Sequence, residues 1–181
     1  MLEAEQDIVI AAKKGDALSF GKLYDHYVKP IYRFIAVKVS VRQEAEDLTH
    51  EVFLTAWQKL PSFTFQGFPF SSWLYRIARN RVIDHYRTKK QHADIGEIDE
   101  KLLGIVESHE AGIDSSLTLR EVYGAMKQLT ADQQDVLLLR FVDDMSPKEI
   151  AEVLDKTEGS IRIIQHRAIE ALKKQLTTND S

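Results

Sequence analysis

Cysteine is absent from the 181-residue sequence, so the chain has no disulfide bond, no thiolate metal site and no cysteine nucleophile. Glycine and proline are few, with eight and four residues, and alternation of apolar and polar residues is rare. Such a sequence lacks the turns and the period of a β-sheet, so we expect an all-α fold. No apolar run reaches the ~18 residues of a membrane span, and no signal segment opens the chain. We therefore expect a cytoplasmic protein without membrane insertion.

The sequence also lacks the motifs of the common catalytic sites. It contains no P-loop, no G-x-G-x-x-G turn and no H-E-x-x-H zinc motif, and its six histidines include no pair spaced four residues apart. Side chains for catalysis or metal binding are therefore not gathered in a recognisable pattern. We expect no catalytic residue, no metal site and no cofactor.

Charge is distributed unevenly along the chain, although the net charge is only −4. Residues 70–92 contain six basic residues against Asp84, and residues 156–175 contain five against two acids. Between them, residues 93–117 contain seven acids against Lys101. Two basic blocks on either side of an acidic stretch indicate two anion-binding surfaces. Each block taken alone is equally typical of a solvated helix face.

Helix starts are marked by four capping boxes, in which a residue with a side-chain oxygen precedes Glu or Gln by three positions. The four pairs are Ser40/Gln43, Thr118/Glu121, Thr130/Gln133 and Ser146/Glu149. Together with apolar residues at helical spacing, they predict a series of helices. The predicted ranges are 3–14, 17–39, 41–60, 70–90, 119–128, 131–143, 147–154 and 158–176. We expect Gly15 to end the first helix and Asp16 to cap the second.

The acidic stretch separates two groups of predicted helices. Residues 93–117 hold three of the eight glycines as well as the excess of acids, a composition typical of a linker. We expect this acidic linker to join two small helical domains, at residues 1–92 and 118–181. A short docked helix around Leu102–Val106 is the alternative within the linker.

Residues 130–176 follow the order of a helix-turn-helix motif, with a turn at Asp155–Thr157 before the last helix. In such motifs the N-terminal residues of the second helix reach base edges in the major groove. Arg162, Gln165 and His166 stand at the matching positions, and arginine and glutamine are the side chains that suit guanine and adenine. A plain helical hairpin without a DNA function has the same pattern.

The helix predicted at 41–60 is polar and acidic on one side. Its apolar stripe is wider than one core face needs, because Phe53, Leu54 and Trp57 extend it. An apolar surface beside acids indicates a protein partner. A helix that the core wraps on several sides is the alternative.

Four phenylalanines lie within the eight residues Phe63–Phe70, directly before the basic helix predicted at 70–90. Some of them must fill the core, but aromatic side chains beside cations are also typical of surfaces that stack the bases of single-stranded DNA. Within the helix, Asn80 is a poor helix former whose amide can bond a base edge. We expect Asp84 to pair with a neighbouring cation.

Segments in this order resemble bacterial sigma factors of the sigma-70 family, in the extracytoplasmic-function (ECF) group. Asp47–Phe53 (DLTHEVF) is similar to the helix that docks on polymerase, and Phe70–Asn80 (FSSWLYRIARN) to the segment that recognises and melts the −10 element. Ser146–Ala151 (SPKEIA) with Glu158–Ala168 (EGSIRIIQHRA) resembles the helix-turn-helix that reads the −35 element. The resemblance covers nearly the whole chain.

This resemblance implies a transcription initiation factor that binds core RNA polymerase, directs it to promoters and helps to open the DNA. It implies a sigma region 2-like domain at residues 1–92 and a sigma region 4-like domain at residues 118–181. The implied partners are the β′ clamp helices and the β flap of core RNA polymerase, promoter DNA and an anti-sigma factor. The free protein is expected to be a monomer.

The resemblance also assigns roles to individual residues. The implied polymerase contacts are Asp47, His50, Glu51 and Leu54. The implied −10 and melting residues are Phe65, Phe68, Arg76, Arg79, Asn80 and Arg87. The implied −35 residues are Lys148, Ser160, Arg162, Gln165, His166 and Arg167. The family usually has glutamine at the position of His50 and often a basic residue at that of Ile164.

Two other classes of protein share part of this pattern. A conventional helix-turn-helix regulator, which binds duplex operator DNA without polymerase, accounts for residues 130–176 but not for the aromatic loop or the acidic helix. An all-helical protein-interaction module predicts no salt-sensitive DNA binding. Copurification with core RNA polymerase distinguishes a sigma factor from both of these classes.

Overall fold

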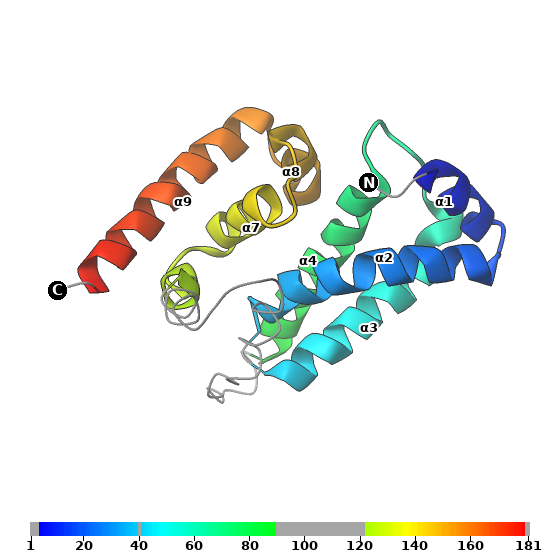
Figure 1. Cartoon of the computed structure of the whole chain (residues 1–181), viewed down its shortest axis with the longest axis horizontal. Helices are drawn as coiled ribbons and strands as arrows, with labels where there is room; N and C mark the ends of the chain where they lie inside the picture. Colours follow the sequence, from blue (N-terminus) through cyan, green and yellow to red (C-terminus); the bar gives the residue numbers. More distant parts are fainter. Residues whose placement is uncertain (1–3, 40, 90–121, 180–181) are drawn as a thin grey trace, which may run out of the picture. The chain divides into compact units, whose positions relative to one another are not determined.

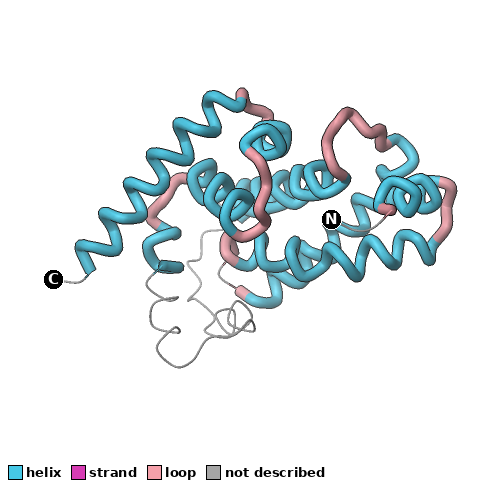
Figure 2. Tube along the Cα trace, turned by 45° about the horizontal axis from the view of Figure 1, so that its top comes forward, coloured by secondary structure: helices cyan, strands magenta, loops and turns pink. Residues whose placement is uncertain are grey.

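A computed structural model describes residues 4–39, 41–89 and 122–179, and all regular structure in these ranges is helical (Figures 1 and 2). The expectation of an all-α fold is therefore confirmed. The chain divides into two compact units, residues 1–98 and 99–181, and each is described by itself. No helix in the described ranges is long and apolar enough to cross a membrane.

The first unit is a bundle of four α-helices. They are α1 (Glu5–Lys13), α2 (Ala17–Ala36), α3 (Arg42–Lys59) and α4 (Phe70–Lys89), with a 3-10 turn, η1 (Leu60–Ser62), after α3. Helix α2 packs against the other three (Figure 1). The largest fully buried side chains in this unit are Phe34, Phe70, Leu23, Ile31, Ile35, Leu60 and Leu74.

The corner between α1 and α2 forms as the sequence predicts. Gly15 has φ +93°, a left-handed conformation that glycine adopts without strain. The Asp16 carboxylate accepts hydrogen bonds from the backbone N–H groups of Leu18 and Ser19, both at 3.3 Å. The hydrogen bond from the Ser19 hydroxyl is the main cause that lowers the pKa of Asp16. Asp16 is therefore the N-cap of α2.

Of the capping box predicted at Ser40/Gln43, only Gln43 lies among the described residues. Helix α3 begins at Arg42, one residue later than predicted, and its N-cap is Val41, whose side chain makes no capping hydrogen bond. The Gln43 amide instead donates to Asp47 Oδ1 at 3.0 Å. Ser40 itself lies outside the described residues, as do Thr118 and Glu121 of another predicted box.

The second unit contains a helix-turn-helix. Residues 122–127 are helical, followed by α7 (Ala131–Phe141), α8 (Pro147–Leu154) and α9 (Glu158–Asn179). Helix α9 packs on both α7 and α8. The core side chains buried here are Val136, Leu137, Leu138, Leu139, Ile150, Val153, Leu154, Ile161 and Ala168.

The two remaining capping boxes are confirmed. Thr130 accepts from the N–H of Gln133 while the Gln133 side chain accepts from the N–H of Thr130, and Ser146 and Glu149 do the same at the start of α8. Asp155 ends α8 in the left-handed region at φ 53°, and Thr157 Oγ1 accepts from the N–H of Ser160 at 3.2 Å. These local bonds fix the turn between α8 and α9.

Several predicted helix ends are longer or shorter than observed. The prediction of 17–39 overruns α2, which ends at Ala36, because Val39 continues the apolar pattern from the loop, where it is buried. Likewise α7 ends at Phe141 rather than at 143, while α9 continues to Asn179. Apolar spacing alone does not tell a buried loop residue from a helical one.

Candidate partner and nucleic-acid interfaces

The four side chains predicted to contact a protein partner share the outer face of α3. Asp47, His50, Glu51 and Leu54 are spaced three or four residues apart, so they form one stripe along the helix. All four are exposed, and Leu54 has 59% of its surface open to solvent. The opposite face, with Ala45, Leu48, Val52 and Ala56, is buried. The outer face of α3 is therefore acidic and ends in an apolar residue that the fold does not cover.

An apolar groove of about 360 Å³ adjoins this stripe between α2 and α3. Its lining consists of Ala17, Phe20, Tyr24, Phe53, Leu54 and Trp57. The rings stack edge to face across the two helices, with centroids 4.8 Å apart for Phe20 and Trp57 and 4.7 Å apart for Tyr24 and Phe53. Of the three residues that widen the apolar stripe of α3, Phe53 is buried in the core, whereas Leu54 and Trp57 remain accessible to solvent.

The aromatic loop between α3 and α4 is anchored to α1 at both ends. The Lys13 ammonium donates to the backbone oxygen of Phe63, and the Glu5 carboxylate accepts from the backbone N–H of Phe70 at 3.2 Å. Phe63 and Phe70 are buried and fill the core, as expected for part of this loop. Phe65 and Phe68 are only half-buried, so the two side chains proposed for base stacking remain partly open to solvent.

Glu5 ties three helices together. Besides the N–H of Phe70 at the start of α4, it accepts a hydrogen bond from the Tyr27 hydroxyl of α2. Burial, together with this neighbouring carboxylate, raises the pKa of Tyr27 well above its usual value. Glu5 is only 7% exposed and lies between its two donors, the Tyr27 hydroxyl and the N–H of Phe70.

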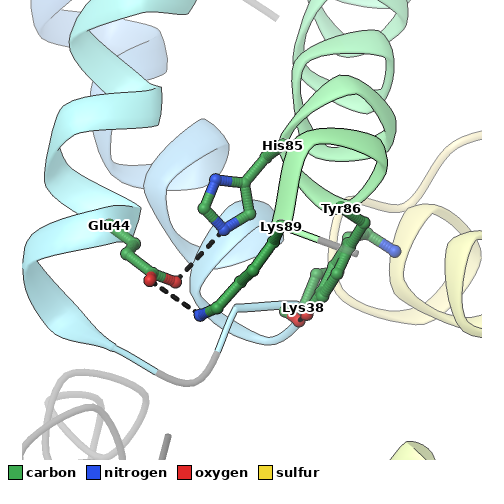
Figure 3. A network of polar contacts seen from close by, with 5 residues as sticks. All are labelled: Lys38, Glu44, His85, Tyr86 and Lys89. Atoms are coloured by element: carbon green, nitrogen blue, oxygen red, sulfur yellow. Dashed lines mark hydrogen bonds and ion pairs between the residues drawn. The ribbon is translucent and has the colours of Figure 1, made fainter. Parts of the chain in front are cut away.

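One side of the basic helix α4 is occupied by ion pairs with α3. Arg81 donates to Thr55 Oγ1 at 2.8 Å and lies 3.7 Å from Glu51. Figure 3 shows the next turns, where His85 and Lys89 reach from α4 to the carboxylate of Glu44 on α3, at 3.2 and 2.8 Å. Two of the cations counted in the basic block, Arg81 and Lys89, therefore neutralise acids within the fold.

Beside Lys89 in Figure 3, the Tyr86 hydroxyl donates to the backbone oxygen of Lys38, after α2. Burial raises the pKa of Tyr86. The C-terminal turns of α4 are thus fixed both to α3 and to the loop that precedes α3.

The other side of α4 carries the residues predicted to meet DNA. Arg76, Asn80 and Arg87 recur at helical spacing on it, and Arg79 flanks them. Asn80 is exposed, while Arg76 and Arg79 are half-buried. As predicted, Asp84 pairs with a cation, since its carboxylate lies 3.7 Å from Arg87.

The residues of α9 that are predicted to read bases lie in its N-terminal turns. Arg162, His166 and Arg167 are exposed, as is Lys148 on α8, while Ser160 and Gln165 are half-buried. Arg162 forms an ion pair with Glu158 at 2.6 Å, and the Ser160 hydroxyl bonds Thr157 Oγ1 at 2.8 Å. An exposed pair of this kind contributes at most ~1 kcal/mol, so Arg162 can leave Glu158 for another anion at little cost.

Two family models match the chain in the same order as these surfaces. Sigma-70 region 2 matches residues 23–92, and sigma-70 region 4 matches residues 125–174. Over 171 residues, 94% of this chain, the sequence is 37% identical to the ECF RNA polymerase sigma factor BldN of Streptomyces coelicolor, of which it spans 65%. It is 31% identical to the ECF sigma factor SigW of Bacillus subtilis, over 91% of this chain and 92% of SigW.

The chain belongs to the ECF group of the sigma-70 family. As a member of this family it is a transcription initiation factor, and the operator-binding regulator is not favoured. Family identity also implies a non-catalytic protein.

Two solved structures share the fold of this sigma factor. CnrH, in a complex with the cytosolic domain of CnrY, aligns with a TM-score of 0.75 over 98% of this chain and 99% of its own, at 22% identity. The sigma factor RpoE of Bartonella quintana, in a complex with the anti-sigma factor NepR, aligns with a TM-score of 0.72 over 87% of this chain and 96% of its own. It is also 22% identical.

Sequence reasoning missed three features of this sigma factor. The groove depends on Phe20 and Tyr24, whose place beside α3 no local pattern reveals. The Glu44–His85–Lys89 network joins residues about forty positions apart. Ile163 is exposed among the cations of α9, and only its place in the helical period could have indicated this.

Proposed function

We propose that this sigma factor binds core RNA polymerase through the outer face of α3 and the adjoining apolar groove. The observation that carries this proposal is the coincidence of uncovered apolar side chains, Leu54 and Trp57, with the acids Asp47 and Glu51 on one helix face. An apolar centre with a charged rim is the usual composition of a protein interface. The complementary surface on polymerase is proposed to be the β′ clamp helices.

For the second unit we propose a contact with the β flap. Phe141 and Val142 at the end of α7 are both more than half exposed, although they are large and apolar. They offer a second apolar surface that is separate from the recognition helix.

For the −10 element we propose that Phe65 and Phe68 stack unpaired bases while Arg76, Arg79, Asn80 and Arg87 follow the strand. The half-buried rings lie directly before the open side of α4, and stacking is worth ~1–3 kcal/mol per base. Since Arg81 and Lys89 are engaged with α3, they are not part of this surface.

For the −35 element we propose that α9 enters the major groove. Arg162, Gln165, His166 and Arg167 face the bases and phosphates, while Lys148 on α8 and Ser160 contact the backbone. The exposed Gly159 in the first turn adds no side chain between the helix and a phosphate. With the polymerase as its partner, the protein acts in the cytoplasm.

An anti-sigma factor is proposed to cover the groove and the α3 face until polymerase is needed. RpoE, one of the two solved structures with this fold, is in a complex with the anti-sigma factor NepR. The same uncovered apolar residues serve both partners, so the two must exclude each other.

The proposed melting role is tested with Asn80→Ala and Phe68→Ala in reconstituted holoenzyme. Both changes should lower transcription from duplex promoters about tenfold, because each lost contact contributes ~1–3 kcal/mol to opening the DNA. Templates already opened around −10 do not need this free energy, so the effect on them should be smaller. Gln6→Ala on α1, an exposed amide outside the proposed surface, is the matched control. Equal losses on both templates would show that these residues only support the fold.

A further inference from the structure

Ile163 occupies the centre of the exposed face of α9. The buried residues Ile161 and Ala168 define the opposite face of the helix, and Ile163 leaves 55% of its surface in solvent. Its neighbours three and four residues away are Gly159, Ser160, His166 and Arg167. It therefore lies in the second turn of the recognition helix, surrounded by the side chains assigned to DNA.

The fold does not require isoleucine at this position. Ile163 is not among the buried core of the second unit, and a β-branched residue is a weaker helix former than alanine or arginine. An exposed isoleucine here leaves apolar surface in water beside two potential cations. Its presence is explained if another apolar group covers it when the helix is bound.

The major groove offers one apolar group on a base edge, the 5-methyl of thymine. Arg162 and Arg167 on either side of Ile163 supply charge that attracts the phosphates next to the groove. Apart from its chain neighbours and its own helix backbone, nothing lies within 4 Å of a Cβ added at Gly159, one turn earlier, so this side of the helix is open. The groove therefore brings a methyl group within reach of an exposed isoleucine.

We propose that Ile163 is a specificity-determining residue that reads a thymine of the −35 element through its methyl group. This rests on the proposed −35 role of α9. Burial of one methyl group is worth about 0.8 kcal/mol, or about fourfold in affinity. Ile163 thus adds a preference for thymine to the hydrogen bonds made by its polar neighbours.

The test uses reconstituted holoenzyme and a library of promoters randomised in the −35 element. The wild type should enrich thymine at one position, and Ile163→Ser should lose that enrichment while keeping the other preferences. Deoxyuridine at that position, which removes only the methyl group, should weaken wild-type binding about fourfold. The Ile163→Ser holoenzyme should bind the thymine and deoxyuridine promoters equally well, whereas the Ile163→Val holoenzyme should still bind the thymine promoter more tightly.

The control is Ile10→Ser on α1, at an isoleucine of similar exposure outside the recognition helix. It should select the same −35 sequences as the wild type. An Ile163→Ser variant that still enriches the same thymine, or a wild type indifferent to deoxyuridine, would overturn this proposal alone. A wild-type holoenzyme without any −35 preference would overturn the proposed role of α9 itself.

Discussion

At the scale of single residues, Glu5 shows how a buried carboxylate supports a surface it does not reach. Its two oxygens accept from the Tyr27 hydroxyl and from the N–H of Phe70, so α1, α2 and the start of α4 share one acceptor. Together with Lys13, it fixes the ends of the aromatic loop. Helix α1 thus acts as the support of the proposed −10 surface.

Glu5→Ala should lower the free energy of unfolding by about 2 kcal/mol or more, because two buried donors lose their acceptor at ~1–3 kcal/mol each. Denaturant unfolding followed by circular dichroism measures this. Glu5→Gln keeps one oxygen acceptor and should cost less. If Glu5→Ala is as stable as the wild type, the bonds to Tyr27 and Phe70 do not hold the loop.

Tyr27 predicts a loss of stability in alkaline solution. Its pKa is raised in the folded state above the ordinary value of 10.0, so the folded state resists losing this proton. The stabilisation is complete below pH 10 and declines as the pH rises beyond it, since only the unfolded chain then ionises readily. The thermal midpoint should therefore fall less between pH 9 and about pH 11 in Tyr27→Phe than in the wild type. Identical slopes would contradict this role for Tyr27.

At the scale of helices, the proposed role of α9 predicts that base reading and general attraction to DNA depend on different residues. Arg162 lies in its first turns, whereas Lys173 lies about three turns further along, beyond the usual reach of a groove-bound helix. Arg162→Ala should cost ~1–3 kcal/mol on the preferred promoter and flatten the preference at one or two −35 positions. Lys173→Ala should weaken all sequences alike or have no effect. Holoenzyme binding to a panel of −35 variants measures both.

The reverse result would place the helix differently. If Arg162→Ala leaves the ranking of −35 variants intact while Lys173→Ala reorders it, then α9 lies in the groove in the opposite direction.

The starts of most helices could be predicted from sequence because their causes are local. Asp16, Thr130 and Ser146 each bond the backbone two or three residues away, so the caps follow from residue type and spacing. At the start of α3 the local chemistry is different, because the N-cap Val41 has no capping side chain and the Gln43 amide donates to Asp47, one turn along the helix.

The functional surfaces could be predicted only in part. The resemblance assigned Asp47, His50, Glu51 and Leu54 to a partner contact, and the structure shows all four exposed on one face of α3. The partners of Arg81 and Lys89 depend on how α3 packs against α4, which periodicity does not contain. For the same reason the sequence counted Arg81 and Lys89 toward a basic surface, and it indicated only the α3 side of the groove, through Phe53, Leu54 and Trp57.

At the scale of the whole molecule, the charge balance predicts weak DNA binding by the protein alone. The net charge is −4, and acids of α3 neutralise two cations of α4 within the first unit. Non-specific affinity for DNA comes mainly from cations that displace counterions, so the free chain has little of it. We therefore expect the proposed promoter contacts to form only within the holoenzyme.

The central claim is that α3 and its groove bind core RNA polymerase, and the most direct test is the Kd of the purified protein for core enzyme. Asp47→Arg with Leu54→Arg changes an exposed acid and an exposed apolar residue, and spares Glu51 because of its contact with Arg81. Asp7→Arg with Ile10→Arg makes the same two changes on α1. The wild type and the α1 variant should bind equally, and the α3 variant about tenfold more weakly or worse. An α3 variant that stays folded and binds core enzyme as the wild type does would contradict the claim.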